Sequence, residues 1–557
     1  MVWDRRTLIR RLGSLLAVAL FSRSPRLAAA APARDLGILT PFYRSTQLQG
    51  HLIGYGLIDI PDYLTASDID LRYMKKPGMK QEVPFVDSFS IVRFLGGYRE
   101  DWLKRSQHWD ARLGLRSLDY AIRHSDGALQ FRPELIRQRL QPFLEAGYRP
   151  QDVTIALDNV PWDLATKDGR PPEAGPWGRR SPPGNLAEWT ATIRQFAVDL
   201  QHYLGPAAAA VRFKTGVEYD EKASFDGTDS EFYEYYQTTD RALHAVLPTA
   251  ILTPGEFTGR GVCEADAPSC VYDTEDFLRF AAGKNLTIPY VPRSLNSFID
   301  QPGVWPSATA ERAIDSYVRL GSVGREIDQF GLFAKPFQSS DIAALQANWE
   351  FQTLVRLWAR LQPRRIFHWP AVPAVGRLPL LDGSGFLRLV LDRHLGARAY
   401  WLDVQDQAAA GPGTAEMLAV GFQGGPSSAV VVSSFSTRPG ATRRRAIVAL
   451  PSTLPAGGPL KTIRYRGSDN VYMLMRRDLA AADNLKPEFA ACPLCVAFPI
   501  AMARDADRAR AMLARNWSLY VAAMKENLRW VRNDAGVARN GGQLLVTLEP
   551  NELVVIE

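Results

Sequence analysis

Between about residues 88 and 370, short runs typical of β-strands alternate with longer amphipathic runs typical of α-helices. In RFKTGVEYD (212–220), apolar and polar side chains alternate with a period of two, which indicates a strand with one face packed against apolar neighbours. In PELIRQRLQPFLEAG (133–147), apolar residues share one helical face and a glycine ends the run. The eight strand candidates are SIVRFLGG (90–97), LDYAI (118–122), VTIALDNV (153–160), VRFKTGVE (211–218), AILTPGE (250–256), IPYVPRSLNSF (288–298), REIDQFGLF (325–333) and RIFHW (365–369).

This alternation predicts an α/β protein built on a (β/α)8 TIM barrel at residues 88–397. A doubly wound open sheet is the alternative, but its first strand normally leads into a Gly-rich phosphate turn, and FLGGYRED (94–101) is a poor version of one. From 398 to 557, short β-rich runs separated by Gly and Pro predict an accessory C-terminal β-sandwich with one inserted helix. We expect residues 35–87 to form an N-terminal segment that pairs with this sandwich.

Residues 1–34 predict an export signal rather than a part of the fold. The paired Arg5 and Arg6 precede an apolar run at 12–21, and small residues follow it, as in a Tat-type signal peptide. The run is too short for a stable membrane anchor. We therefore expect a periplasmic or secreted protein without an integral membrane segment in the mature chain; an uncleaved leader acting as a tether is the alternative.

Charge and cysteine content narrow the classes of function. The formal net charge is +7, but residues 1–31 contain six Arg and one Asp, which leaves about +2 without them. We therefore expect no nucleic-acid partner. Cys263 and Cys270, and Cys492 and Cys495, form two local pairs that predict disulfides in an oxidising compartment, with free thiols as the alternative. Seven His residues, no HExxH motif and no calcium loop predict neither a metal site nor a cofactor.

Carboxylates at the ends of the fourth and seventh strand candidates carry the functional prediction. The carboxyl ends of barrel strands form the active-site face. Glu218 ends the fourth strand, and Glu326 and Asp328 share one face of the seventh by strand alternation. Glycoside hydrolysis needs such a pair, with one carboxyl group protonated and the other ionised. We expect Glu218 to be the general acid/base and Asp328 or Glu326 its partner; an ion pair with a neighbouring Arg is the alternative for the latter two.

Other side chains at strand ends are candidates for binding a glycan substrate. Trp369 ends the eighth strand, where its ring would form a platform beneath a sugar; burial in the core is the alternative. Amide, guanidinium and carboxylate groups in similar places are candidates for contacts with hydroxyl groups, and a structural hydrogen bond is their alternative role. These residues are Arg93, Asn159, Glu256, Asn296 and Trp369.

The segment RFKTGVEYDEKASFDGTDSEFYEYYQTTDRALHAVLPTAILTP (212–254) resembles the acid/base region of glycoside hydrolase family 39, a clan A family of barrel glycosidases. AGYRPQDVTIALDNVPWDL (146–164) resembles the strand-three pattern of that family, and RFLGGY (93–98) its strand-one region. The resemblance covers about residues 88–400. It implies retaining hydrolysis of a glycosidic bond, with Glu218 at the position of the acid/base.

Two residues depart from the pattern of that family. Val217 stands where the family has an Asn that contacts the sugar, and Gln329 stands where its register places the nucleophile. Strand alternation favours Asp328 instead, and its shorter side chain favours an inverting geometry, so both stereochemical outcomes stay open. The departures also motivate an alternative function: a non-catalytic glycan-binding or exopolysaccharide-assembly protein on a degenerate barrel.

Overall fold

The computed structural model describes residues 33–38, 43–46 and 89–557 of the chain, with breaks inside the last range. The breaks are 94, 99, 104–108, 146–148, 166–173, 176–177, 217, 220–223, 256, 258–273, 299–304, 322, 335–336, 342, 364, 369–373, 376–377, 380–382, 407–414, 425–427, 438–440, 451–458, 492–495 and 497–501. The predicted signal peptide and all four cysteines lie outside the described residues.

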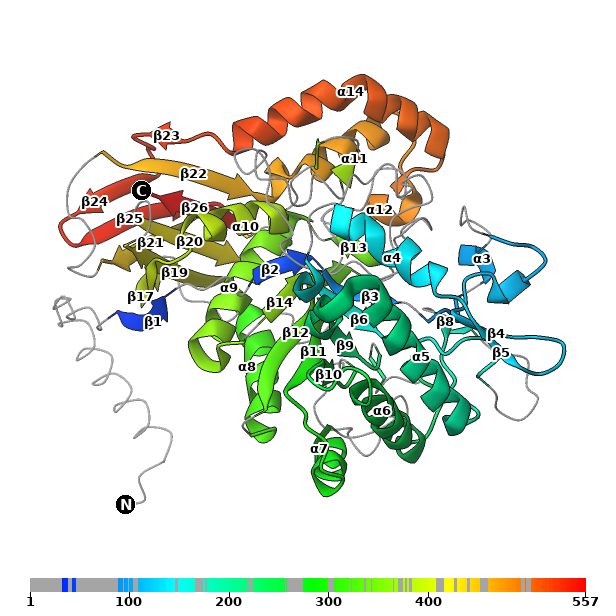
Figure 1. Ribbon diagram of the computed structural model, residues 1–557. Coiled ribbons are helices and arrows are strands. Elements are labelled where there is room, and N and C mark those ends of the chain that lie inside the picture. Colours follow the sequence, from blue (N-terminus) through cyan, green and yellow to red (C-terminus); the bar gives the residue numbers. More distant parts are fainter. Residues whose placement is uncertain are drawn as a thin grey trace, which may run out of the picture.

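Parallel strands form the centre of a mixed α/β fold (Figure 1). One parallel sheet has the order β10-β9-β6-β3, and a second has the order β11-β12-β14-β2, with β13 (Phe337–Asp341) attached to β12. A parallel bridge between Phe257 and Arg293 joins the two sheets on one side, and β2 lies beside β3 on the other. The strands are β2 (Tyr43–Thr46), β3 (Phe89–Arg93), β6 (Val153–Ala156), β9 (Arg212–Lys214), β10 (Ile251–Thr253), β11 (Tyr290–Phe298), β12 (Gly324–Ala334) and β14 (Arg365–His368).

Helices lie between successive strands along the chain and outside the sheets (Figure 1). Local sequence explains where two of them begin. The side chain of Asn185 accepts hydrogen bonds from two backbone N–H groups at the start of α5, and Thr228 and Glu231 form a capping box at the start of α6. The helices are α4 (Glu134–Glu145), α5 (Leu186–Leu204), α6 (Asp229–His244), α7 (Thr274–Gly283), α8 (Pro306–Arg319), α9 (Ala343–Leu361) and α10 (Gly383–Arg393).

The prediction for the second strand was wrong. The run at 118–122 ends in β4 (Ala121–Arg123), which pairs antiparallel with β5 (Leu129–Phe131) as a hairpin outside the parallel sheets. The run at 90–97 contains β3, which is the second parallel strand because β2 precedes it in the chain. The third to eighth predicted strands keep their places, so Glu218 still follows strand four.

Two antiparallel sheets occupy the C-terminal part. Their orders are β1-β17-β19-β20-β26-β22-β23 and β18-β21-β25-β24, and a shared apolar core that includes Val432, Val546 and Ile556 lies between them. The strands are β1 (Arg34–Ile38), β17 (Arg398–Leu402), β18 (Val404–Asp406), β19 (Glu416–Gln423), β20 (Ala429–Phe435), β21 (Arg444–Ala449), β22 (Lys461–Arg466), β23 (Val531–Arg532), β24 (Val537–Asn540), β25 (Gln543–Leu548) and β26 (Glu552–Ile556). Helices α11 (Val471–Ala481), α12 (Pro487–Ala491) and α14 (Ala506–Asn527) lie between β22 and β23 in the chain.

Helix α9 joins the parallel-strand region to the antiparallel sheets. Asn348 accepts a hydrogen bond from Ser433 of β20 at 2.7 Å, and Arg356 forms an ion pair with Glu416 of β19 at 3.1 Å. The carboxylate of Glu416 also accepts the backbone N–H of Ser307 at 3.1 Å, in the first turn of α8. Because the N-cap residue of α8 makes no side-chain cap, Glu416 supplies the negative charge that a helix N-terminus favours.

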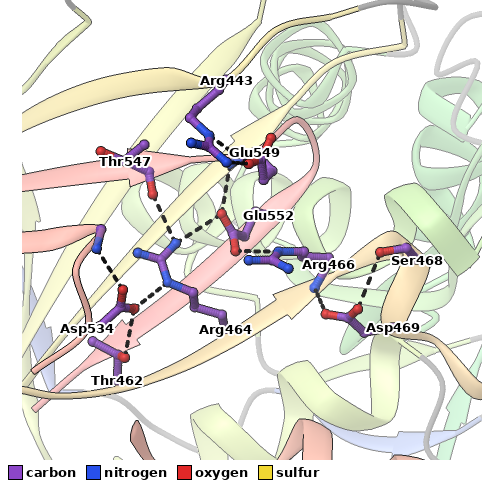
Figure 2. Close-up of polar contacts among 11 residues, drawn as sticks. Arg443, Thr462, Arg464, Arg466, Ser468, Asp469, Asp534, Thr547, Glu549 and Glu552 are labelled. Carbon is purple, nitrogen blue, oxygen red and sulfur yellow. Dashed lines mark hydrogen bonds and ion pairs between the residues drawn. The ribbon is translucent and has the colours of Figure 1, made fainter. Parts of the chain in front are cut away.

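An ion-pair network around the buried Glu552 connects strands β22 and β26 and the loop before β24 (Figure 2). Arg464 contacts the carboxylates of Asp534 and Glu552, and it donates to the Thr547 carbonyl at 2.9 Å. Glu552 also pairs with Arg466 at 3.0 Å. Although burial acts to raise it, hydrogen bonds from Arg464 and the Gly536 backbone hold the pKa of Asp534 below its ordinary value.

Candidate active site

The turn after β9 places Glu218 at the carboxyl end of the fourth parallel strand. Gly216 permits the turn, because a Cβ at this position would lie 2.3 Å from two ring carbons of Tyr219. Glu218 adopts a left-handed backbone conformation, with φ of +50°, which non-glycine residues rarely take. It is half-buried, whereas Tyr219 is buried beside it. Strained backbone of this kind is concentrated at functional sites.

An aromatic cluster holds this turn in place. The ring of Tyr219 stacks on Phe225 with centroids 5.0 Å apart, and it meets Phe232 of α6 edge-on at 5.4 Å. Tyr235, one helical turn further along α6, also contacts Tyr219. Aromatic pairs in these geometries stabilise a fold beyond the area that they bury. The four rings therefore hold Tyr219, the residue directly after Glu218, in place.

Tyr235 also ties together the ends of strands three and four. Its buried hydroxyl group donates to the Leu157 carbonyl after β6 and lies 3.2 Å from the Thr215 carbonyl after β9. Burial raises the pKa of Tyr235 well above its ordinary value, and the nearby Tyr219 and Asp158 add to the shift. The hydroxyl group therefore stays protonated as a donor to these carbonyls.

The end of β6 carries two polar residues beside this turn. Asp158 is 1% exposed, and Asn159 is 5% exposed with φ of +50°. The sequence prediction named Asn159 but not Asp158. A carboxylate in LDNVP, directly after an apolar strand, was the signal in the sequence that could have identified Asp158.

Glu326 forms a buried ion pair. Arg212 at the start of β9 donates to its two carboxylate oxygens at 2.8 and 2.7 Å, and both side chains are at least 93% buried. Because β9 and β12 belong to different sheets, this contact crosses the space between them. It is the ion-pair role that the sequence left open for Glu326. Both carboxylate oxygens are engaged by a cation, which suits a structural group better than one that exchanges protons with substrate.

A bulge in β12 interrupts the strand alternation from which the sequence placed Asp328 on the same face as Glu326 and Gln329 on the opposite one. Arg293 of β11 pairs with Ile327 and Ser294 pairs with Gln329, so Asp328 is the extra residue. Beyond the bulge, Phe330 stacks on Trp349 of α9 and so faces the helix layer. In an unbroken strand, Phe330 would instead share a face with Glu326, which points away from that layer towards Arg212. Alternation therefore does not assign Asp328 and Gln329 to opposite faces. The structure describes the backbone of both residues, in β12.

The other candidates are placed less fully. Arg93 ends β3 and Asn296 lies in β11, and the structure describes the backbone of both. Glu256 and Trp369 lie outside the described residues. Within the described part, no group of three or more His, Cys, Asp or Glu side chains is arranged to hold a metal ion. Each helix in that part is too short or too polar to cross a bilayer.

The known proteins to which the chain is similar in sequence or in fold are glycosidases. No known family profile matches the chain. An α-1,4-L-rhamnosidase from Formosa agariphila is 22% identical over 222 residues, which cover 38% of this chain and 41% of that protein. The chain thus matches less than half the length of this relative.

Among solved structures, a 4-O-α-L-rhamnosyl-β-D-glucuronidase from Fusarium oxysporum gives a TM-score of 0.47 at 12% identity, covering 95% of this chain and 98% of that one. A family 51 α-L-arabinofuranosidase from Bifidobacterium longum gives 0.46 at 13% identity, covering 94% and 97%. None of these three descriptions names family 39.

Proposed function

We propose that the chain is an exported glycoside hydrolase that cleaves glycosidic bonds of a polysaccharide or oligosaccharide by a two-carboxylate mechanism. In this proposal the eight parallel strands form one closed (β/α)8 barrel, and the two antiparallel sheets form its accessory β-sandwich domain. The placement of Glu218 is the observation that carries the proposal. It is a half-buried carboxylic acid on a strained, aromatic-braced turn at the carboxyl end of β9.

Glu218 and Asp328 are the proposed catalytic pair. Glu218 donates a proton to the leaving oxygen, while Asp328 in its ionised form attacks the anomeric carbon or activates water. The ion pair of Arg212, at the start of β9, with Glu326 of β12 supports the pairing only in that side chains from strands four and seven reach one another across the space between the sheets. Glu326 itself is assigned to the ion pair. The anomer of the first product distinguishes retention, with carboxyl groups about 5–5.5 Å apart, from inversion, with about 6.5–9.5 Å.

Glycans that carry α-L-rhamnosyl residues are the proposed first substrates, because the curated relative is named an α-1,4-L-rhamnosidase. The export signal predicted for residues 1–34 places the reaction in the periplasm or outside the cell. Asn159, Arg93, Asn296, Glu256 and Trp369 remain the proposed substrate-binding residues at the strand ends.

Release of reducing ends from a panel of rhamnose-containing glycans tests the proposal. Wild-type protein and Glu234→Gln, an exposed control on α6, should release them at equal rates. Glu218→Gln should be about 10²–10⁴-fold slower, because proton transfer contributes a factor of that size. Equal rates for Glu218→Gln and wild type would remove Glu218 from the mechanism.

A non-catalytic glycan-binding protein is the second candidate. Gln329 motivates it, because an amide stands in β12 where the family 39 register expects a nucleophile. Calorimetric binding of a glycan by the wild-type protein, with no reducing ends released across the panel, would favour this function over hydrolysis.

A further inference from the structure

Three segments meet at the carboxyl ends of β3 and β6. They are residues 95–98 after β3, residues 117–120 before β4, and residues 157–162 after β6. Tyr120 donates its backbone N–H to the Leu95 carbonyl at 2.9 Å, and the indole N–H of Trp162 donates to the Tyr98 carbonyl at 3.1 Å. The strand ends that would border a substrate are therefore held by contacts between loops.

Asp119 lies at the centre of this junction. One oxygen of its carboxylate accepts the backbone N–H of Gly97 at 2.8 Å, and the other accepts that of Trp162 at 2.6 Å. The side chain is fully buried. One carboxylate thus bridges the loop after β3 and the loop after β6, with a separate oxygen for each.

The backbone around Asp119 is packed too closely to accept a different arrangement. A Cβ on Gly97, whose φ is +64°, would lie 2.7 Å from the carbonyl oxygens of Asn159 and Val160. A Cβ on Gly96, whose φ is +118°, would overlap Asp119 itself. Both glycines are needed for this contact. The position of Asn159 therefore depends on the loop that Asp119 holds.

The carboxyl group of Asp119 titrates near neutral pH. Burial raises its pKa to about 7, and the nearby Asp163 adds to the increase; the N–H groups of Gly97 and Trp162 and the charge of Arg139 oppose it. Arg139 is itself fully buried, above the ring of Tyr98. Two further arginines face the junction: Arg132 donates to the Asp119 carbonyl at 3.1 Å, and Arg116 lies 3.7 Å from Asp163.

We propose that Asp119 is a positioning residue, whose ionised carboxylate aligns the ends of β3 and β6 and so sets the substrate-binding rim at Asp158 and Asn159. The rim as a substrate contact rests on the proposed function. The ionised group accepts both N–H bonds. A protonated carboxyl group accepts well at its carbonyl oxygen but only weakly at its O–H oxygen, so protonation weakens one of the two bonds.

Protonation of Asp119 stabilises the closed junction against opening, even though it weakens one of the two hydrogen bonds. Because the pKa of the folded state lies above the ordinary value of 3.8, the native protein binds this proton more tightly than the unfolded chain does. The contribution of Asp119 to the free energy of unfolding therefore falls as the pH rises from about 4 to about 7 and is constant above that range.

Amide hydrogen exchange at pH 5.5 and 8.5, corrected for intrinsic rates, tests the alignment without a substrate. Because opening of the junction exposes Asp119 and returns its pKa towards 3.8, peptides containing Gly97 and Trp162 in the wild-type protein should be about tenfold less protected at pH 8.5. Asp119→Asn should remove this pH dependence. Asp126→Asn should retain it, because Asp126 is an exposed residue of the same hairpin that also accepts a backbone N–H. Equal protection of wild-type protein at both pH values would overturn the proposal, whether or not the Asn variant folds.

Kinetics on any glycan that the protein hydrolyses test the rim. Asp119→Asn should raise KM about tenfold at pH 8 and leave kcat within about twofold. An unchanged KM would contradict a role in positioning the substrate-binding rim. Absence of hydrolysis by the wild-type protein would contradict the proposed function, while the exchange experiment would still decide whether Asp119 aligns the two strand ends.

Discussion

Gly216 shows how one residue determines the geometry beside Glu218. The ring of Tyr219 occupies the space that a Cβ on Gly216 would take, and the same ring stacks on Phe225. Because Tyr219 follows Glu218 directly, moving the ring also moves the carboxylate. The sequence predicted Glu218 at the end of the strand, but it could not predict that the ring of Tyr219 packs back against Gly216.

Gly216→Ala should therefore destabilise the protein by about 1–3 kcal/mol, the usual range for overpacking a filled site. It should also lower kcat/KM, because the turn that carries Glu218 must shift. Gly283→Ala is the control: a Cβ there meets open space at the end of α7, and stability should be unchanged or rise by up to about 1 kcal/mol. Chemical denaturation with steady-state kinetics measures both effects, and equal behaviour of the two variants would contradict this account of the turn.

Strand assignments show what the pattern along the chain can predict for single elements. The run at 211–218 contains β9, but the strand ends at Lys214, and the buried Arg212 at its first position reaches Glu326 of β12. The partner of Arg212 is 114 residues away in the sequence. No local pattern reveals such a pair, and none reveals the bulge at Asp328.

Glu326→Gln should destabilise the protein by about 3–5 kcal/mol, because it leaves the buried Arg212 without its carboxylate partner. The double variant Arg212→Met/Glu326→Leu should recover most of this loss, since apolar residues of similar volume often replace a buried ion pair at little cost. Urea denaturation of both variants measures the difference. A Glu326→Gln protein of wild-type stability that has lost hydrolysis would make Glu326 catalytic instead.

Much of the architecture of the whole chain was predictable because strand patterns and helix patterns alternate regularly along it. Six of the eight predicted strands occupy the expected places, and β-rich runs after residue 397 form two packed sheets. The first parallel strand was missed because YRST at β2 has four residues and no apolar run. LDYAI was wrongly predicted as a barrel strand because most of its residues are apolar and, in the structure, buried. The run leads into the hairpin of β4 and β5, which Asp119 precedes.

Stability of the C-terminal sheets should depend on the ion-pair network around the buried Glu552 in Figure 2. Glu552→Ala should lower the free energy of unfolding by about 3–5 kcal/mol, because Arg464 and Arg466 both lose a buried partner. Glu549→Ala removes a more exposed carboxylate paired with Arg443, and it should change stability by about 0–1 kcal/mol. Thermal and chemical denaturation compare the two, and an equal effect would mean that the network does not hold these strands.

Dependence of kcat/KM on the leaving group tests the role of Glu218 most directly. On an aryl glycoside with a good leaving group, which needs no proton, Glu218→Gln should retain kcat/KM within about tenfold of wild type. On a glycan or an alkyl glycoside of the same sugar, it should lose about 10²–10⁴-fold. An equal loss on both substrates, or no loss on the glycan, would contradict Glu218 as the general acid.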